Sequence, residues 1–405
     1  MLSDAAWASG FRDIALVKTR AYVGEPKTVD VIMGTRPEAI KMAPVVAALT
    51  RHDRLRCRVV CTGQHREMFH QVADEFGFSV DVDLDTMVPN QTLAGLTARL
   101  MRKIDGWLER GHPDLALVQG DTTTVLVSAL ACFYRRIPIG HVEAGLRTGS
   151  ILAPFPEELN RRLASQMVSL HFAPTRSAQA ALLREGVPEE TIEVTGNTVV
   201  DALFMELSRQ REPDIGASIE TSLSAAIGLD WSVRPYVLIT GHRRENFGDG
   251  FEQICRAIHT LALRYPKYRF IYPVHLNPNV QEPVRRLLSD VSNVVLIPPQ
   301  GYRNFVALMQ RCTLVLTDSG GVQEEAPSLG KPVLVMRDAT ERPEGVEAGT
   351  ARLVGAGATS IVDNAIRLLD DSSAYDAMAN AVNPYGDGHA AERIVARIER
   401  YFGLL

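Results

Sequence analysis

Short apolar runs rich in β-branched residues recur along the chain, and each ends at a glycine or a polar residue. Between them lie segments with helical periodicity, such as PEAIKMAPVVAALTR and DGFEQICRAIHTLALRY. The pattern predicts strands that alternate with helices throughout. The predicted strands of the first half are VDVIMG, RVVCTG, LALVQG, IPIGHV, LHFAP and IEVTG, and those of the second half are YVLITGH, FIYPVH, VVLIPP, LVLTDS, PVLVMR and ARLVG.

Continuous apolar strands of this kind suit parallel, doubly wound sheets that helices cover on both faces. Two such sets contain too many strands for one hydrophobic core. We therefore expect an α/β protein with two Rossmann-like domains that face a cleft. We place the first domain at residues 29–197 and the second at 198–388, with the boundary in TGNTVVDAL. Residues 1–28 are expected to form an N-terminal extension, and a terminal helix in 389–405 could cross back to the first domain.

Composition excludes several classes of partner and cofactor. The formal net charge of −5 argues against a nucleic-acid or anionic-membrane partner, and no apolar stretch is long enough to span a bilayer. Five cysteines without a C-x-x-C pair indicate free thiols of a reducing, cytoplasmic compartment. HVE lacks a following P-C-x-x-C, and no G-x-G-x-x-G follows the first strand, so neither a metal nor a nicotinamide or flavin cofactor is expected.

Ligands of open α/β sheets bind beyond the carboxyl ends of the strands, so residues that follow strands are the candidates for chemistry. After the first strand, GTRPEAIKMAP has Pro37 where a helix would start, and Arg36 and Lys41 flank the positive end of that helix. An anion would be stabilised there by both the side chains and the free N–H groups. The alternative is an ordinary strand-to-helix turn with a solvated lysine.

In the second domain, TDSGGVQEEAPSLGKP offers a phosphate the hydroxyl of Ser319 and the backbone N–H groups of Gly320 and Gly321. Glu324 and Glu325 could accept hydrogen bonds from sugar hydroxyls, so the motif suggests a nucleotide. Ser319 could instead merely cap its helix, and Glu325 could interact with the helix dipole.

ITGHRRENFGDGF places a basic cluster immediately after another strand of the second domain. His242 and Arg243 could balance the charge of a pyrophosphate, which arginine binds through two parallel hydrogen bonds. The alternative is a solvated basic turn, which fits less well at the predicted ligand edge.

Three acids occupy comparable positions in the first domain. Asp121 in QGDTTT and Glu143 in GHVEAGLRTG follow strands, and Glu157 in PFPEELNRR starts a helix. Asp121 could be a helix N-cap, Glu143 could pair with Arg147, and Glu157 could favour its first helical turn. Three acids facing cations across one cleft would be a less ordinary coincidence, and a helix cap need not be the only role of Asp121.

As a set, these motifs resemble the non-hydrolysing UDP-N-acetylglucosamine 2-epimerases, from about Val29 to the C-terminus. The motifs that carry the resemblance are GTRPEAIKMAP, TGQHREMF, GDTTT, GHVEAGLRTG, PEELNRR, TGNTVVDAL, TGHRREN, YPVHLNPNV and TDSGGVQEEAPSLGKPVLVMRDATERPE. The resemblance implies a glycosyltransferase-B-like fold, a homodimer, and interconversion of UDP-GlcNAc and UDP-ManNAc without cofactor or metal, which supplies precursors for surface polysaccharide. The implied mechanism eliminates UDP to leave 2-acetamidoglucal and adds it back with C2 inverted.

The resemblance also implies roles for matching residues. Asp121, Glu143 and Glu157 would be the catalytic carboxylates, with His242 near the pyrophosphate; which carboxylate is base and which is acid stays open. Residues that match other active-site or UDP-contacting positions are Arg36, Lys41, Ser319 and Glu325, with Phe305 near the uracil.

Some members of that family bind a second UDP-GlcNAc as an activator. The matching positions are Gln64, His65, Gln91 and His275. Glu67 stands where the regulated forms have Gln, and Asn90 where they have Arg, so regulation is an open hypothesis.

Three other functions remain as alternatives. A hydrolysing relative would release ManNAc and UDP, and a UDP-sugar glycosyltransferase of the same architecture would need an acceptor site. A non-catalytic UDP-sugar sensor could dispense with the acids, so the presence of all three disfavours it.

Overall fold

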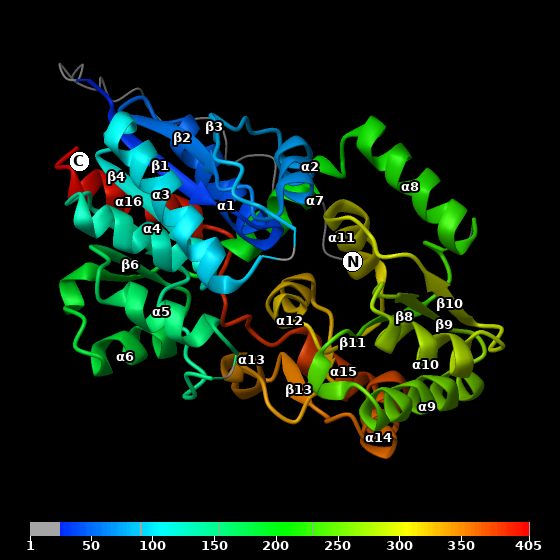
Figure 1. Ribbon diagram of the computed structural model, residues 1–405. Coiled ribbons are helices and arrows are strands. Elements are labelled where there is room, and N and C mark those ends of the chain that lie inside the picture. Colours follow the sequence, from blue (N-terminus) through cyan, green and yellow to red (C-terminus); the bar gives the residue numbers. More distant parts are fainter. Residues whose placement is uncertain (1–24, 90, 153, 230, 405) are drawn as a thin grey trace, which may run out of the picture.

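The computed structural model describes residues 25–89, 91–152, 154–229 and 231–404 of the chain. Most of the predicted extension over 1–28 therefore lies outside the described residues, as does Asn90. The ribbon shows two α/β halves, one blue to green and one green to orange (Figure 1). Each half contains one sheet, and every strand pairing in both sheets is parallel. The prediction of two parallel-sheet α/β domains is confirmed.

The first sheet has seven strands in the order β3-β2-β1-β4-β5-β6-β7. The strands are β1 Lys27–Met33, β2 Leu55–Cys61, β3 Val82–Asp83, β4 Leu115–Gln119, β5 Ile139–Val142, β6 Leu170–Ala173 and β7 Ile192–Val194. The helices of this half are α1 Arg36–Thr50, α2 Arg66–Phe76, α3 Leu93–Gly111, α4 Thr123–Tyr134, α5 Glu157–Ser165, α6 Arg176–Arg184 and α7 Thr198–Arg209. The edge strand β3 is the one strand that the apolar runs did not predict.

The second sheet has six strands in the order β10-β9-β8-β11-β12-β13. They are β8 Tyr236–Thr240, β9 Arg269–Pro273, β10 Val294–Ile297, β11 Leu314–Thr317, β12 Val333–Val335 and β13 Ala351–Leu353. The helices that follow α7 along the chain are α8 Pro213–Ile227, α9 Asp249–Arg264, α10 Pro278–Leu288, α11 Tyr302–Arg311, α12 Gly320–Glu325, α13 Pro343–Glu347, α14 Ala358–Asp370, α15 Ser372–Ala379 and α16 Ala390–Tyr401.

The two halves share an apolar core around α7. Ala202 and Leu203 of α7 belong to the same buried cluster as Val45 of α1 and Val306 of α11. Phe76 at the end of α2 adds a direct ring contact across the junction, at 5.8 Å between centroids, with Tyr302 of α11. Because packed interiors resist deformation, this shared core holds the strand ends of the two sheets toward each other.

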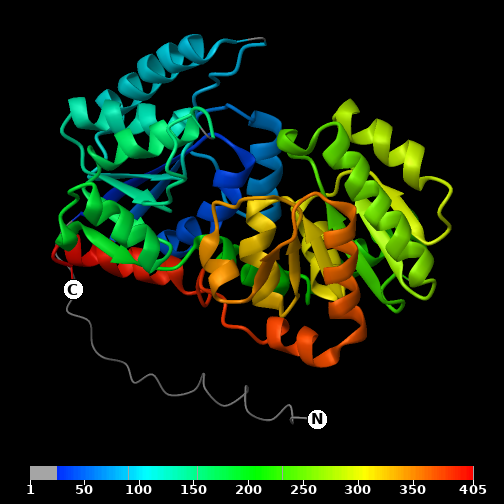
Figure 2. The ribbon, with the colours of Figure 1, turned by 90° about the horizontal axis from the view of Figure 1, so that it is seen from below.

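The last helix, α16, packs against α1 and α7 of the first half. The backbone N–H of Ala391 donates to the Asp201 carboxylate at 2.7 Å, and Glu399 accepts from His52 and Arg54. Figure 2 shows this red helix running along the first half. The loop before α16 therefore carries the chain from the second half back to the first.

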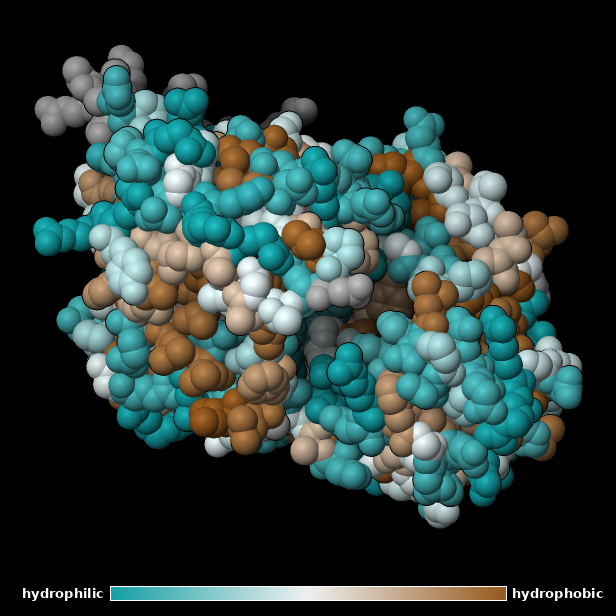
Figure 3. All heavy atoms as spheres, in the orientation of Figure 1, coloured by the Kyte–Doolittle hydropathy of each residue, from teal (hydrophilic) through white to brown (hydrophobic). Residues whose placement is uncertain are grey.

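The molecular surface is hollowed where the two halves meet (Figure 3). No helix in the described parts of the chain combines the length and apolar character needed to cross a bilayer. All five cysteines are free thiols.

Candidate active site

Two neighbouring cavities lie at the carboxyl ends of the strands. The first, of about 280 Å³, lies between the two halves and collects residues from both. Its walls are formed by Thr35, Pro37, Glu38, Lys41, Gln119, Gly120, Asp121, Thr122, Glu143, Pro154, Glu157, Arg161, Arg243, Glu341 and Arg342. Five residues that the sequence singled out thus share one cavity: Lys41, Asp121, Glu143, Glu157 and Arg243.

The second cavity, of about 270 Å³, lies mainly in the second half. It is lined by Arg36, Thr240, Gly241, His242, Pro273, His275, Pro299, Gln300, Tyr302, Phe305, Ser319, Gly321, Val322 and Glu325. Arg36 of the first half thereby joins the residues expected to contact a nucleotide. Gly320 lies at the border between the cavities, because a Cβ there would meet the Arg342 guanidinium at 3.1 Å.

The start of α1 fixes the loops that carry the first cavity. Thr35 and Glu38 form a capping box, and the Glu38 carboxylate also accepts from Gly34 N at 2.7 Å. The same carboxylate accepts from the Thr122 hydroxyl at 2.5 Å. Burial raises the pKa of Glu38 although these hydrogen bonds act in the opposite direction. Glu38 therefore ties the end of β1 to the residue that follows Asp121.

Glu143 follows β5 in a left-handed backbone conformation, with φ of 68°. This conformation is uncommon for a residue with a side chain and turns the carboxylate into the cavity wall. The carboxylate accepts from Lys41 Nζ and, at 3.0 Å, from the Asn197 amide. Burial alone would raise the pKa of Glu143, but the charges of Lys41 and Arg342 outweigh it and lower that pKa. Glu143 is therefore held as a carboxylate, and it does not form the alternative pair with Arg147, which binds Glu185 instead.

Two cations and two carboxylates form a buried cluster across the cleft. Lys41 of the first half lies 3.6 Å from Glu324 of the second, and Arg342 Nε donates to Glu324 at 2.9 Å. Glu324 is fully buried and its Oε1 accepts from Arg342, so its carboxylate belongs to this cluster, and the expected contact with sugar hydroxyls stays a prediction. Lys41 and Arg342 both line the cavity, where cations can stabilise an anionic group of a ligand.

Asp121 does not cap its helix. The N-cap residue of α4 is Thr122, and the Asp121 carboxylate instead accepts from Arg161 Nη2 at 2.7 Å. Asn160 donates to the Asp121 carbonyl oxygen at 2.9 Å, so α5 holds this residue from two directions. The carboxylate stays about one-third exposed, with a relative accessibility of 32%, and lines the cavity. Helix capping therefore does not explain why an acid occupies position 121.

Glu157 is the first residue of α5, after the cis peptide bond between Phe155 and Pro156. Its neighbour Glu158 points inward, is fully buried and pairs with Arg161 and Arg162. The helix start therefore separates the two acids: Glu158 stabilises the helix, and Glu157 lines the cavity.

His242 is placed by a carboxylate that sequence reasoning did not identify. Asp318 Oδ2 accepts from the backbone N–H groups of His242 and Arg243, each at 2.8 Å. The His242 ring lies 3.4 Å from Asp318 Oδ1 and stacks on His275 at 5.5 Å between centroids. Burial, together with Arg243 and His275, lowers the pKa of His242 although Asp318 acts in the opposite direction. The imidazole can therefore donate or accept as a neutral group beside a phosphate.

Glu325 lies in the second cavity, where its carboxylate accepts from the Tyr302 hydroxyl at 2.8 Å. Burial raises the pKa of Glu325 to about 7. Near neutral pH the group exists in both protonation states, so it can accept from a hydroxyl or donate to one.

The four residues of the possible regulatory site are not brought into one cavity. His275 lines the second cavity, whereas Gln64 accepts from Thr124 at 3.3 Å and His65 precedes α2. Gln91 binds Met87 and Arg99. A second nucleotide-sugar site stays a prediction.

The structure adds site residues that sequence reasoning missed: Glu38, Arg161, Asn197, Asp318, Glu341 and Arg342. All of them lie in motifs at strand ends or helix starts, which is the signal that could have found them. Arg342 belongs to DATERPE, the stretch that follows the strand PVLVMR.

Comparisons with known proteins identify relatives of this chain. The family model described as UDP-N-acetylglucosamine 2-epimerase matches residues 47–399. A Yersinia pestis protein named UDP-N-acetylglucosamine 2-epimerase is 53% identical over 371 residues, which cover 91% of this chain and 98% of that one. A Ralstonia solanacearum protein, named as a probable enzyme of the same kind, is 52% identical over 93% of this chain and 100% of its own length.

Among solved structures, the UDP-GlcNAc 2-epimerase of Neisseria meningitidis bound to UDP-GlcNAc superposes with a TM-score of 0.86 at 47% identity. That match covers 92% of this chain and 100% of the other. The family model, these relatives and this solved structure all match over most of the chain. The chain therefore belongs to the UDP-N-acetylglucosamine 2-epimerase family.

Proposed function

We propose that this protein interconverts UDP-GlcNAc and UDP-ManNAc without net hydrolysis. The observation that carries the proposal is the joining of Asp121, Glu143 and Glu157 with the cations Lys41 and Arg342 in one cavity. The adjoining cavity, with Phe305 among its walls, offers space and polar groups for the nucleotide. The UDP-ManNAc that this reaction forms would supply ManNAc-type precursors for surface polysaccharide.

The chemistry explains why acids and cations are needed together. The C2 proton of the sugar is not adjacent to a carbonyl, so a base alone cannot readily remove it. Cleavage of the bond between C1 and the UDP oxygen builds positive charge at C1 and acidifies C2. Lys41 and Arg342 stabilise the UDP that departs with the bonding electrons, while carboxylates stabilise the positive charge and transfer protons.

Loss of UDP and the C2 proton leaves 2-acetamidoglucal in the cleft. Return of a proton to the opposite face of C2, with re-addition of UDP at C1, gives the inverted sugar. Neighbouring cations keep Glu143 ionised, so its carboxylate can stabilise the positive charge that develops at C1. Enclosure between two domains keeps water from capturing the intermediate.

Incubation with UDP-GlcNAc alone in D2O, followed by NMR, tests the proposal. We expect UDP-ManNAc with deuterium at C2, because the proton removed from C2 exchanges with solvent before one returns. Free ManNAc and UDP would identify a hydrolysing enzyme instead. Unchanged substrate without deuterium at C2 would contradict epimerase activity.

We further propose that two copies of the chain associate through exposed apolar side chains on α4, on α5 and on the loop before α5. These side chains, which we call the α4–α5 face, are Phe133, Tyr134, Ile151, Leu152, Phe155, Leu159 and Leu163. Helix α4 packs against α5, and Figure 3 shows brown residues gathered on this side of the first half. Exposed apolar patches of this kind mark association sites.

Light scattering after gel filtration tests the dimer. The double variant Phe133→Glu/Tyr134→Glu should run as a monomer, because charges placed in an apolar interface lose their hydration. Leu263→Glu, on the equally exposed α9 of the second half, is the matched control and should leave the dimer intact. A monomeric wild-type protein would exclude this part of the proposal.

A further inference from the structure

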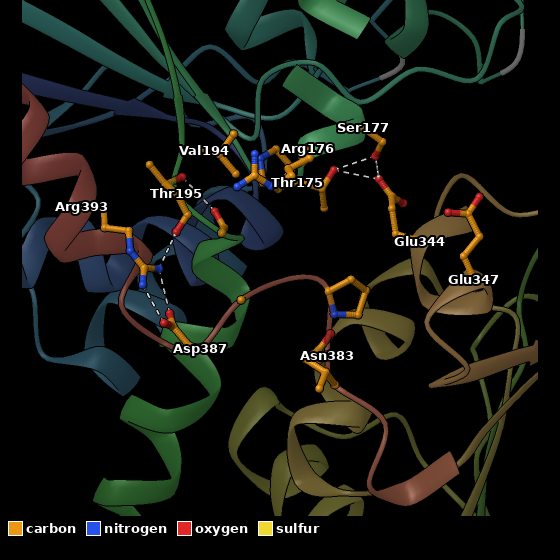
Figure 4. A pocket seen from close by; sticks show the side chains of 15 residues that line it. Thr175, Arg176, Ser177, Val194, Thr195, Glu344, Glu347, Asn383, Asp387 and Arg393 are labelled. Carbon is orange, nitrogen blue, oxygen red and sulfur yellow. Dashed lines mark hydrogen bonds and ion pairs between the residues drawn. The ribbon is translucent and has the colours of Figure 1, made fainter. Parts of the chain in front are cut away.

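Besides the first cavity, which we call the catalytic cavity because the proposed reaction takes place there, residues of both halves line a hollow of about 680 Å³. Its walls come from the start of α6, from α13 and from the loop between α15 and α16 (Figure 4). The hollow leaves α13 without continuous packing against the first half at this point. Helix α13 packs against β13 of its own half, and polar contacts across the hollow join it to the first half.

Glu344 of α13 makes the contacts that bridge the hollow. Its Oε1 accepts from the Thr175 hydroxyl at 2.8 Å and from the Ser177 hydroxyl, both at the start of α6 (Figure 4). The Thr175 oxygen also accepts from Ala178 N at 3.2 Å and lies 2.9 Å from the Ser177 hydroxyl, so the helix start holds both hydroxyls beside Glu344. The positive end of the α6 dipole favours an anion at the same place.

The loop before α16 supports α13 from its other side. The Tyr385 side chain is fully buried, and its hydroxyl accepts from Gly345 N at 3.2 Å and makes a longer contact of 3.5 Å to Glu344 Oε2. The carbonyl oxygen of Tyr385 accepts from Asn197 N at 2.6 Å, and the Asn197 amide binds Glu143. Both carboxylate oxygens of Glu344 are thus tied to groups whose positions are fixed.

Glu344 is linked to the catalytic cavity through a short and stiff stretch of chain. Arg342 lines that cavity and is separated from Glu344 only by Pro343, whose ring restricts the backbone. A shift of α13 relative to α6 would therefore move the Arg342 guanidinium relative to Glu143 and to the pyrophosphate.

We propose that Glu344 is a positioning residue, which sets the place of Arg342 in the catalytic cavity by binding Thr175 and Ser177 of the opposite domain. The proposal rests on the proposed epimerase function. Small misplacements of groups that stabilise a transition state cost rate rather than ground-state binding.

Three variants test this role by steady-state kinetics with UDP-GlcNAc. Glu344→Ala should lower kcat about 10- to 100-fold with little change in KM, as expected for misplaced catalytic groups. Glu344→Gln keeps an acceptor for both hydroxyls and should recover much of the loss. Glu347→Ala is the matched control and should keep the wild-type rate, because Glu347 is an exposed acid of the same helix that lines the same hollow, and none of the dashed lines in Figure 4 reaches it.

A double-mutant cycle with Arg342→Lys separates positioning from general destabilisation. If Glu344 acts through Arg342, Glu344→Ala should cost far less in the Arg342→Lys background than in the wild type. Equal losses in both backgrounds would overturn the proposal.

Hydrogen exchange of residues 338–349 gives a readout that does not require activity. Glu344→Ala should speed exchange in this segment, and Glu347→Ala should not. Unchanged exchange in Glu344→Ala would overturn the inference even if the protein is an active epimerase. Faster exchange in a protein that fails to epimerise UDP-GlcNAc would support the contact and reject the function.

Discussion

Asp121→Asn should lower kcat for epimerisation by about 10²- to 10⁴-fold, the range that positioned proton-transfer groups contribute. The substitution keeps the shape of the side chain and removes its ability to carry a proton or a negative charge. It should leave the fold intact, because Arg161 retains Glu158 at 3.2 Å and the Leu146 carbonyl at 3.1 Å. The measurements are kcat, KM, deuterium incorporation at C2 and the melting temperature.

Asp105→Asn is the matched control for that experiment. Asp105 also binds an arginine, with Arg135 Nη2 at 2.8 Å, and is partly exposed, but it lies on α3 outside both cavities. Loss of its ion pair should leave kcat unchanged. A near-normal rate for Asp121→Asn would mean that Asp121 serves only to hold Arg161.

Local sequence pattern was enough to predict the two sheets. The segments Val29–Met33 and Leu115–Gln119 are apolar nearly throughout and become neighbouring strands, buried on both faces, as parallel sheets require. The strand β3 was missed because it has two residues, Val82 and Asp83, and its alternation with polar residues gives no apolar run.

The site residues that follow strands could also be predicted from the sequence, because a parallel sheet gathers the carboxyl ends of its strands at one edge. Asp121 and Glu143 line one cavity for this reason, and Lys41 reaches it from α1, the helix that follows β1. The hydrogen-bond and ion-pair partners of these residues were harder to predict from the sequence. Asp121 and Thr122 are both common N-cap types, and only the backbone conformation shows that Thr122 occupies the cap.

Contacts between the two domains could not be predicted from sequence. Glu324 resembles a sugar-binding acid in its motif, yet the approach of the domains buries it against Lys41 and Arg342. That approach depends on the packing of α7 and α11 and on the return of α16, which are long-range features. Local patterns carry no information about them.

Lys41→Met should destabilise the protein by about 3–5 kcal/mol at pH 8, the usual cost of removing one partner from a buried ion pair. Glu143 and Glu324 have 8% and 0% exposed side chains, so neither carboxylate can recover its hydration. Urea unfolding gives the free energy, and UDP-GlcNAc turnover should also fall, since the substrate loses a cation. Lys27→Met is the control, because its pair with Asp114 is more exposed, at 38% and 33%, and should cost at most about 1 kcal/mol.

The loss of stability in Lys41→Met should depend on pH, because the pKa of Glu143 is lowered in the wild type. In the wild type, that shift stabilises the fold above the usual carboxyl pKa, and the stabilisation is lost as the pH falls through the lowered value. Without Lys41 the pKa of Glu143 rises. The difference in the free energy of unfolding between wild type and Lys41→Met should therefore become smaller from pH 8 toward pH 4. Because Lys41 itself has a raised pKa, it stays charged throughout that range and adds no pH dependence of its own.

The double variant Lys41→Met/Glu143→Gln removes the unpaired charge and should regain stability without regaining turnover. Equal stability of the single and double variants would contradict the role assigned to this ion pair.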